Sequence, residues 1–320
     1  MHVLIPHFSS LSPAYVATLD SLAANDLPAL SAWLSQAKIT AEEPLAEDAE
    51  LLKSAPHERW ISGQARSLPA AAQQHPAALP GALLQLCNWH VGREQLVLTN
   101  VESVDVTAAE DAALQAAITP LLIEDGFVVT PLEPGRWHLQ HPSLHTLETT
   151  SPLRAQGRPV THWLPTGEFA KVWKRISNEL QMLLYSHALN DARAERGQLA
   201  INSVWLWGTG TMAEIQSSYF APAERFDWSY RFTSDSDKTL PTLTIIDLLT
   251  TPVLGEDWLC YAGALRLVDA QLRPLLAQPG VKLTLCGERR WVTLGAAKQG
   301  FFSKLFGAPP KPFAQLIPAL

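Results

Sequence analysis

The polar residues best suited to do chemistry gather between positions 190 and 203. Asn190, Arg193 and Arg196 stand at the end of one segment, and Asn202 and Ser203 open the next. Ligands in open α/β sheets bind beyond the strand ends, so these side chains predict a small pocket for an anionic ligand. The alternative is that the asparagine anchors the strand while the arginines pair with surface acids.

A helix, a glycine stop and a strand must position these side chains. Between Phe169 and His187 the apolar residues recur at steps of three and four, which predicts one helical face. Gly197 is a suitable helix stop, and the run Ile201–Trp207 predicts a buried strand. Gly208 and Gly210 then predict a tight turn; no Gly-Lys-Ser/Thr follows, so the turn is not a P-loop.

Further strands alternate with helices along the rest of the chain. Alternation of this kind predicts the α/β class, with a mostly parallel sheet covered by helices. The expected strands are 2–7, 201–207, 243–248, 281–286 and 291–294, with helices after Ser12 and over 258–276.

A β-α-β-β order in the middle predicts a separate small α+β unit over residues 91–150. Its helix opens with a capping box, Thr107 to Glu110. The α/β core is then expected over 1–90 and 151–300. The remaining tail, 301–320, is apolar, basic and proline-rich at its start; it either folds back onto the body or docks a partner.

Composition narrows the possible partners and the compartment. The 320 residues carry a formal net charge of −7, which argues against nucleic acid and anionic membranes as partners. No apolar run approaches the roughly 20 residues of a membrane helix. Three cysteines without a CxxC pair fit free thiols in a reducing compartment. We therefore expect a cytoplasmic protein that binds a small anionic ligand or a protein partner.

The stretch HALNDARAERGQLAINSVWLWGTG resembles an element of archaeal-type cofactor-independent phosphoglycerate mutases, of the alkaline-phosphatase-like superfamily. It is more similar still to a bacterial branch, the regulatory proteins of the RpfE type. The residues that carry this likeness are Asn178-Glu179, Gln181-Met182, Asn202-Ser203 and Trp205, with Pro56-His57-Glu58-Arg59 and Asn88-Trp89-His90 elsewhere. The resemblance implies an alkaline-phosphatase-like core with an inserted α+β unit.

The same resemblance implies a changed active site. The mutases use two divalent metals and a serine nucleophile, with Asp-Gly at the end of the first strand and Asp-His after the closing strand. Here Ile5-Pro6-His7-Phe8 and Cys286-Gly287-Glu288 stand at those places, and all ten histidines lie at or before His187. The family's two-metal site is therefore expected to be dismantled, with no cofactor.

Three functions follow as hypotheses. The first is a non-catalytic, mutase-like protein with a binding or regulatory role. The second is an active phosphomutase or phosphatase that holds a divalent metal such as manganese through other ligands. The third is a protein that docks a partner through its C-terminal tail. His57 is a further candidate ligand-binding residue, or else simply part of a first helical turn.

Overall fold

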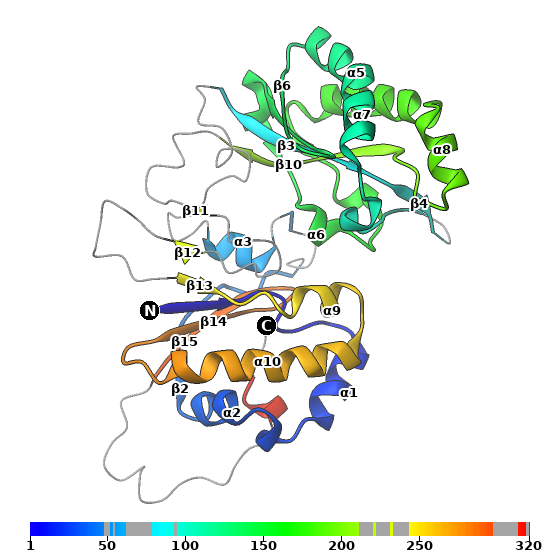
Figure 1. Ribbon diagram of the computed structural model, residues 1–320. Helices are drawn as coiled ribbons and strands as arrows, with labels where there is room; N and C mark the ends of the chain where they lie inside the picture. Colours follow the sequence, from blue (N-terminus) through cyan, green and yellow to red (C-terminus); the bar gives the residue numbers. More distant parts are fainter. Residues whose placement is uncertain are drawn as a thin grey trace, which may run out of the picture. The chain divides into compact units, whose positions relative to one another are not determined.

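The computed structural model divides the chain into two compact units. One combines residues 1–61 and 218–320, and the other is the continuous segment 62–217 (Figure 1). Each unit carries helices against a sheet, so the fold is mixed α/β. The structure describes residues 1–47, 52–53, 55–61, 79–92, 95–210, 220–221, 231–232, 243–296, 313–317 and 320.

The sheet of the first unit is mixed rather than mostly parallel, which corrects the sequence expectation. Its order is β13 (Leu243–Ile245), β1 (His2–Ile5), β14 (Lys282–Cys286), β15 (Trp291–Ala296) and β2 (Ala37–Glu42). β1 is parallel to β13 and β14, but β15 is antiparallel to both of its neighbours. The short link between β14 and β15 explains this, because a parallel pair needs a long crossover.

Helices cover both faces of this sheet (Figure 1). Val3, Ile5 and Leu283 share a core with the buried side of α10 (Trp258–Leu276). Leu4 points to the opposite face, where it packs with Trp60 of α3 (Pro56–Ile61). This alternation is what a strand covered on both sides requires. The other helical segments of the unit are α1 (Pro13–Ser21), η1 (Ala24–Asp26), α2 (Pro28–Leu34) and α9 (Thr250–Leu254).

Part of the C-terminal tail folds back onto the first unit. Phe313, in η9 (Phe313–Gln315), is fully buried in the same core as α10. Residues 301–312, where a docking segment was one of the two expectations, lie outside the described residues. The described part of the tail is therefore a structural element.

The second unit is built on an antiparallel sheet. Its order is β10 (Ser203–Gly210), β3 (Gly81–Cys87), β7 (Arg136–Gln140) and β6 (Val128–Glu133). Every pairing in it is antiparallel. Two helices, α5 (Ala108–Glu124) and α7 (Ala170–Tyr185), share its main apolar core. The smaller elements are β4 (Trp89–Val91), β5 (Leu96–Leu98), η4 (Val101–Val104), η5 (Pro142–Thr146), β8 (Leu147–Glu148), α6 (Pro152–Ala155), η6 (Val160–His162), β9 (Thr166–Gly167) and α8 (Leu189–Glu195).

The boundary between the units differs from the expected one. The strand predicted at 201–207 was assigned to a parallel core, but it pairs antiparallel with β3 in the second unit. The helix before it covers the same core as α5. The segment 151–217 therefore folds together with 91–150 rather than with the first unit.

Two short strands remain, β11 (Phe220–Ala221) and β12 (Arg231–Phe232), which pair with each other. None of the described helices is both long and apolar enough to cross a membrane.

Candidate functional site

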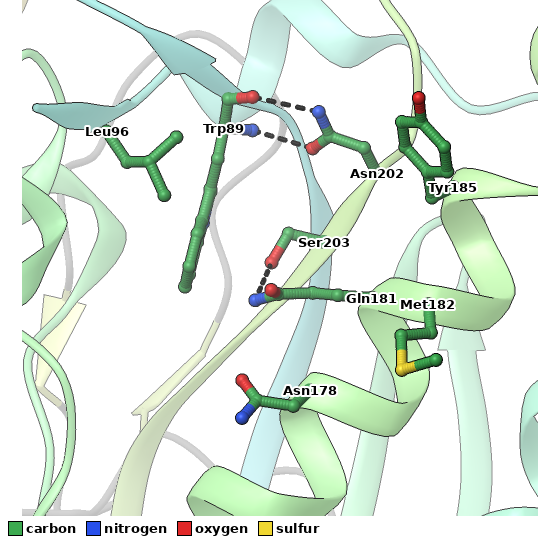
Figure 2. Close-up of a pocket in the computed structure, with 8 residues that line it drawn as sticks. All are labelled: Trp89, Leu96, Asn178, Gln181, Met182, Tyr185, Asn202 and Ser203. Carbon is green, nitrogen blue, oxygen red and sulfur yellow. Dashed lines mark hydrogen bonds between the residues drawn. The ribbon is translucent and has the colours of Figure 1, made fainter.

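An open hollow of about 510 Å³ lies in the second unit, where α7 faces the start of β10 and the β4–β5 hairpin (Figure 2). Several residues that carry the family resemblance border it. Figure 2 shows the Trp89 ring edge-on, with Leu96 on one side and Gln181 and Ser203 on the other. The lining consists of Trp89, Leu96, Asn178, Gln181, Met182, Tyr185, Asn202 and Ser203.

Asn202 fixes the position of Trp89. Its Oδ1 accepts a hydrogen bond from the Trp89 backbone N–H at 2.8 Å, and its Nδ2 donates to the Trp89 carbonyl oxygen at 2.8 Å. The Trp89 ring also meets Trp205 edge-on, with ring centroids 6.2 Å apart. Because the Asn202 side chain bonds both the backbone N–H and the carbonyl oxygen of Trp89, it holds Trp89 in one place. This wall of the hollow is therefore formed before any ligand arrives.

The opposite wall presents amide groups from α7. Gln181 donates from Nε2 to the Ser203 hydroxyl at 3.1 Å, which leaves its Oε1 as an acceptor. The exposed Asn178 amide has no hydrogen-bond partner among the described residues. Met182 and Tyr185 add large exposed apolar surface. No charged side chain is among the described residues that line the hollow.

Cys87 of β3, which pairs with Ser203, carries a fully buried thiol. Burial raises the pKa of Cys87 far above its usual range, and hydrogen bonds from Trp89 and Ser203 offset only part of this. The thiol therefore stays protonated at neutral pH. Cys286 is buried as well and Cys260 is exposed, and all three cysteines are free, as the sequence predicted. The groups of the hollow can bind a ligand by stacking and hydrogen bonding.

The two predicted ligand-binding arginines form part of the internal framework instead. Arg193 is 1% exposed and donates from Nη1 to Glu110 at 2.9 Å. Its other hydrogen bonds go to backbone carbonyls, that of Leu199 at 2.7 Å among them. Arg196 donates to the second oxygen of Glu110 at 2.8 Å. Both guanidinium groups therefore pair with one carboxylate, and neither borders the hollow.

Glu110 is the centre of this framework. Its carboxylate also accepts from the backbone N–H and the hydroxyl of Thr107, each at 3.0 Å, which completes the predicted capping box of α5. Burial raises the pKa of Glu110, but the bonds from Thr107 and the charge of Arg193 outweigh burial and lower it overall. Sequence reasoning identified the capping box yet missed this pairing, because Glu110 lies 83 residues from Arg193.

Asn190 also has a structural role. Its Nδ2 donates to the carbonyls of Leu184 and Ile201, both at 2.9 Å, and its Oδ1 accepts from Ile201 N–H at 2.8 Å. This joins the end of α7 to the approach to β10. Of the five residues predicted between positions 190 and 203, the structure brings only Asn202 and Ser203 to the hollow.

His57 lies in the first unit, near the end of β1. Its ring centroid is 5.2 Å from that of His7, which has a positive φ of 51°. Phe8 follows and is fully buried. Its carbonyl oxygen accepts hydrogen bonds from two buried tyrosines, Tyr15 at 3.2 Å and Tyr261 at 2.7 Å. The strand end is thus closed by packed aromatic side chains.

Among the described residues, the metal-ligating side chains are not grouped as a two-metal centre would require. Across the described parts of the chain, no group of three or more His, Cys, Asp or Glu side chains is arranged to hold a metal ion. Near the end of β1, the Ser10 hydroxyl instead donates to Glu288 at 3.1 Å. A metal-bridged phosphoryl transfer needs a dense cluster of hard ligands, which these residues do not supply.

Comparison with known proteins places these observations in a wider context. The chain is 28% identical over 136 residues to a probable 2,3-bisphosphoglycerate-independent phosphoglycerate mutase of Geobacter sulfurreducens, covering 42% of this chain and 34% of the relative. A second mutase, from Methanothrix thermoacetophila, is 34% identical over 61 residues, covering 19% of this chain and 16% of the relative. The sequence is related to the cofactor-independent phosphoglycerate mutases. The matched stretches span about a third and a sixth of these relatives' own lengths.

Solved structures give weaker likenesses. A cofactor-independent phosphoglycerate mutase from Thermoplasma acidophilum superposes with a TM-score of 0.36 at 13% identity, covering 93% of this chain and 90% of the other. A protein from Pyrococcus horikoshii gives 0.41 at 12% identity, covering 93% and 87%. No protein-family model matches the chain.

Proposed function

We propose that this phosphoglycerate-mutase-like protein has a binding or regulatory role and no mutase chemistry. In this proposal the first unit is an alkaline-phosphatase-like core without its metal centre. The hollow of the second unit is the binding site. The resemblance to regulatory proteins of the RpfE type and the similarity to mutases of two organisms support the ancestry.

The observation that carries the proposal is the closed end of β1. In the mutases the resemblance places a metal-binding Asp-Gly there. Here Ile5-Pro6-His7-Phe8 stands at that place; Phe8 is fully buried, and its carbonyl oxygen accepts hydrogen bonds from two tyrosine hydroxyls. An apolar side chain packed among aromatic rings cannot replace a carboxylate as a ligand for a divalent cation.

The test combines metal analysis with activity assays. The purified full-length chain is dialysed against manganese, its metal content is measured, and mutase and phosphatase turnover are assayed with the same metal. We expect less than one tightly bound metal per chain and turnover at the level of a no-protein blank. Two metals per chain together with turnover would refute the proposal.

One observation favours the second candidate, a metal-dependent phosphomutase or phosphatase. His7 and His57 come together at the end of a parallel strand, where ligands of open α/β sheets bind. If this pair serves catalysis, His57→Gln will abolish metal-dependent turnover, whereas His145→Gln, an exposed histidine of the second unit, will not.

A further inference from the structure

We propose that the hollow of the second unit binds an uncharged, planar heteroaromatic ring of the nucleobase class. The ring would lie against the Trp89 indole, with its polar edge toward the amides of Asn178 and Gln181. This inference rests on the proposed binding role and names the class of ligand.

The chemistry of the lining selects a flat ring. An indole face and the neighbouring Tyr185 and Met182 favour an aromatic partner, through stacking and sulfur–aromatic contact. Base–aromatic stacking is tolerant of the base, because every base has a π-face. Figure 2 shows the ends of Asn178 and Gln181 directed to the side of the hollow where Trp89 lies.

The amides provide the polar complement. Asn178 has both an unused donor and an unused acceptor among the described residues, and Gln181 keeps its Oε1 acceptor. Side-chain amides placed in this way match the alternating donors and acceptors on the edge of a base. Gln181 is held by Ser203, so its acceptor is already oriented.

The charge of the ligand is inferred from the positions of the cationic side chains. Arg193 and Arg196, which lie between α7 and β10 in the chain, are both paired with Glu110. Arg175, three residues before Asn178, pairs with Asp125 and Glu179. With no charged group among the described lining residues, a phosphate or carboxylate would lose part of its hydration without gaining a cationic partner. The structure therefore favours a neutral ring over the anion expected from the sequence.

The experiment is a calorimetric titration of the full-length protein with adenosine and, separately, with adenosine monophosphate and inorganic phosphate. We expect adenosine to bind with a Kd on the order of 0.1 mM, typical of ligands of its size. The monophosphate should bind no more tightly than adenosine, and inorganic phosphate should not bind.

Two variants test whether the ligand contacts Asn178 and Trp89. Asn178→Ala, an exposed change that breaks no hydrogen bond, should weaken adenosine binding roughly fivefold. Trp89→Leu should weaken it at least about tenfold. Lys174→Ala lies one turn earlier on α7, outside the lining, and should leave the Kd unchanged. Circular dichroism checks that each variant is folded, and if Trp89→Leu is not folded, Asn178→Ala decides alone.

Three results would overturn the inference. The first is adenosine binding that Asn178→Ala leaves unaltered. The second is the absence of adenosine binding up to 10 mM, roughly a hundred times the expected Kd. The third is a monophosphate that binds more than about tenfold tighter than adenosine. Mutase turnover would instead refute the proposed function while the adenosine titration still stands, so the two failures are distinguishable.

Discussion

Replacing Glu110 by glutamine tests whether the buried Arg193 depends on a single carboxylate. The change keeps the shape of the side chain and removes its charge. Arg193 is 1% exposed, so the variant leaves a buried guanidinium without its counterion. Breaking a buried pair in this way costs about 3–5 kcal/mol. We expect a loss near 3 kcal/mol, since the glutamine oxygen still accepts one hydrogen bond.

Hydrogen exchange followed by mass spectrometry measures this loss within the second unit. A loss of about 3 kcal/mol speeds exchange of the α5 amides by roughly 10²-fold. Two control substitutions are measured for comparison. Glu124→Gln, at an exposed site on the same helix, should stay within about 0.5 kcal/mol. Arg196→Ala removes the half-exposed partner and should cost below about 1 kcal/mol.

The pH dependence gives an independent check. The folded pKa of Glu110 is lowered, so its stabilisation is complete above the unfolded value of about 4.3 and is lost as pH falls through the folded value. The difference between wild type and Glu110→Gln should therefore shrink below about pH 4. A Glu110→Gln effect no larger than that of Glu124→Gln at pH 7 would refute the assigned role.

Four further changes probe the first unit by urea unfolding of the full chain. Gly287→Ala should cost about 1–3 kcal/mol, because its Cβ would lie 2.4 Å from Ser9 Oγ. Gly263→Ala in α10, where a Cβ meets nothing within 4 Å, should instead add up to about 1 kcal/mol; equal effects would contradict the packing at Gly287. Burial raises the pKa of Asp247 to about 6. The wild-type protein therefore loses stability as pH rises from about 3.9 through that value. Between pH 4 and 8, the stability of Asp247→Asn relative to wild type should increase by about 2 kcal/mol. A pH-independent difference would count against that burial. Phe313→Ala should cost about 3–5 kcal/mol; a loss below about 1 kcal/mol would mean that the end of the chain is not part of the core.

The sequence predicts best the elements whose periodicity is strong and local. The helix expected from Phe169 onward, the helix after Thr107 with its capping box, and the strand near residue 203 are all present. Two strands of the main sheets escaped prediction. β3 is an apolar run of seven residues, all buried, which periodicity alone cannot assign. β2 is largely exposed at the edge of its sheet, so its burial does not follow the apolar–polar alternation of its sequence, AKITAE.

Partners distant in sequence explain the remaining differences. The antiparallel pairing of β10 with the unpredicted β3 decided the unit boundary, and no local signal records it. The same holds at the site, where Arg193 and Asn190 are polar residues at plausible positions. Glu110, 83 residues away, engages Arg193, and nearby backbone carbonyls engage Asn190. Asn202 and Ser203 were predicted from their place at the opening of a strand, and they also carry the resemblance.

The pairing of β1 has a consequence for how the chain is made. His2 is synthesised long before its sheet neighbours, Leu243 and Lys282. At about 5–20 residues per second, roughly 10–50 s separate His2 from Leu243 during translation. The second unit, a continuous segment, is complete before then. We expect it to fold on the ribosome while the apolar β1 still lacks a partner, which makes this strand the segment of the nascent protein most in need of a chaperone.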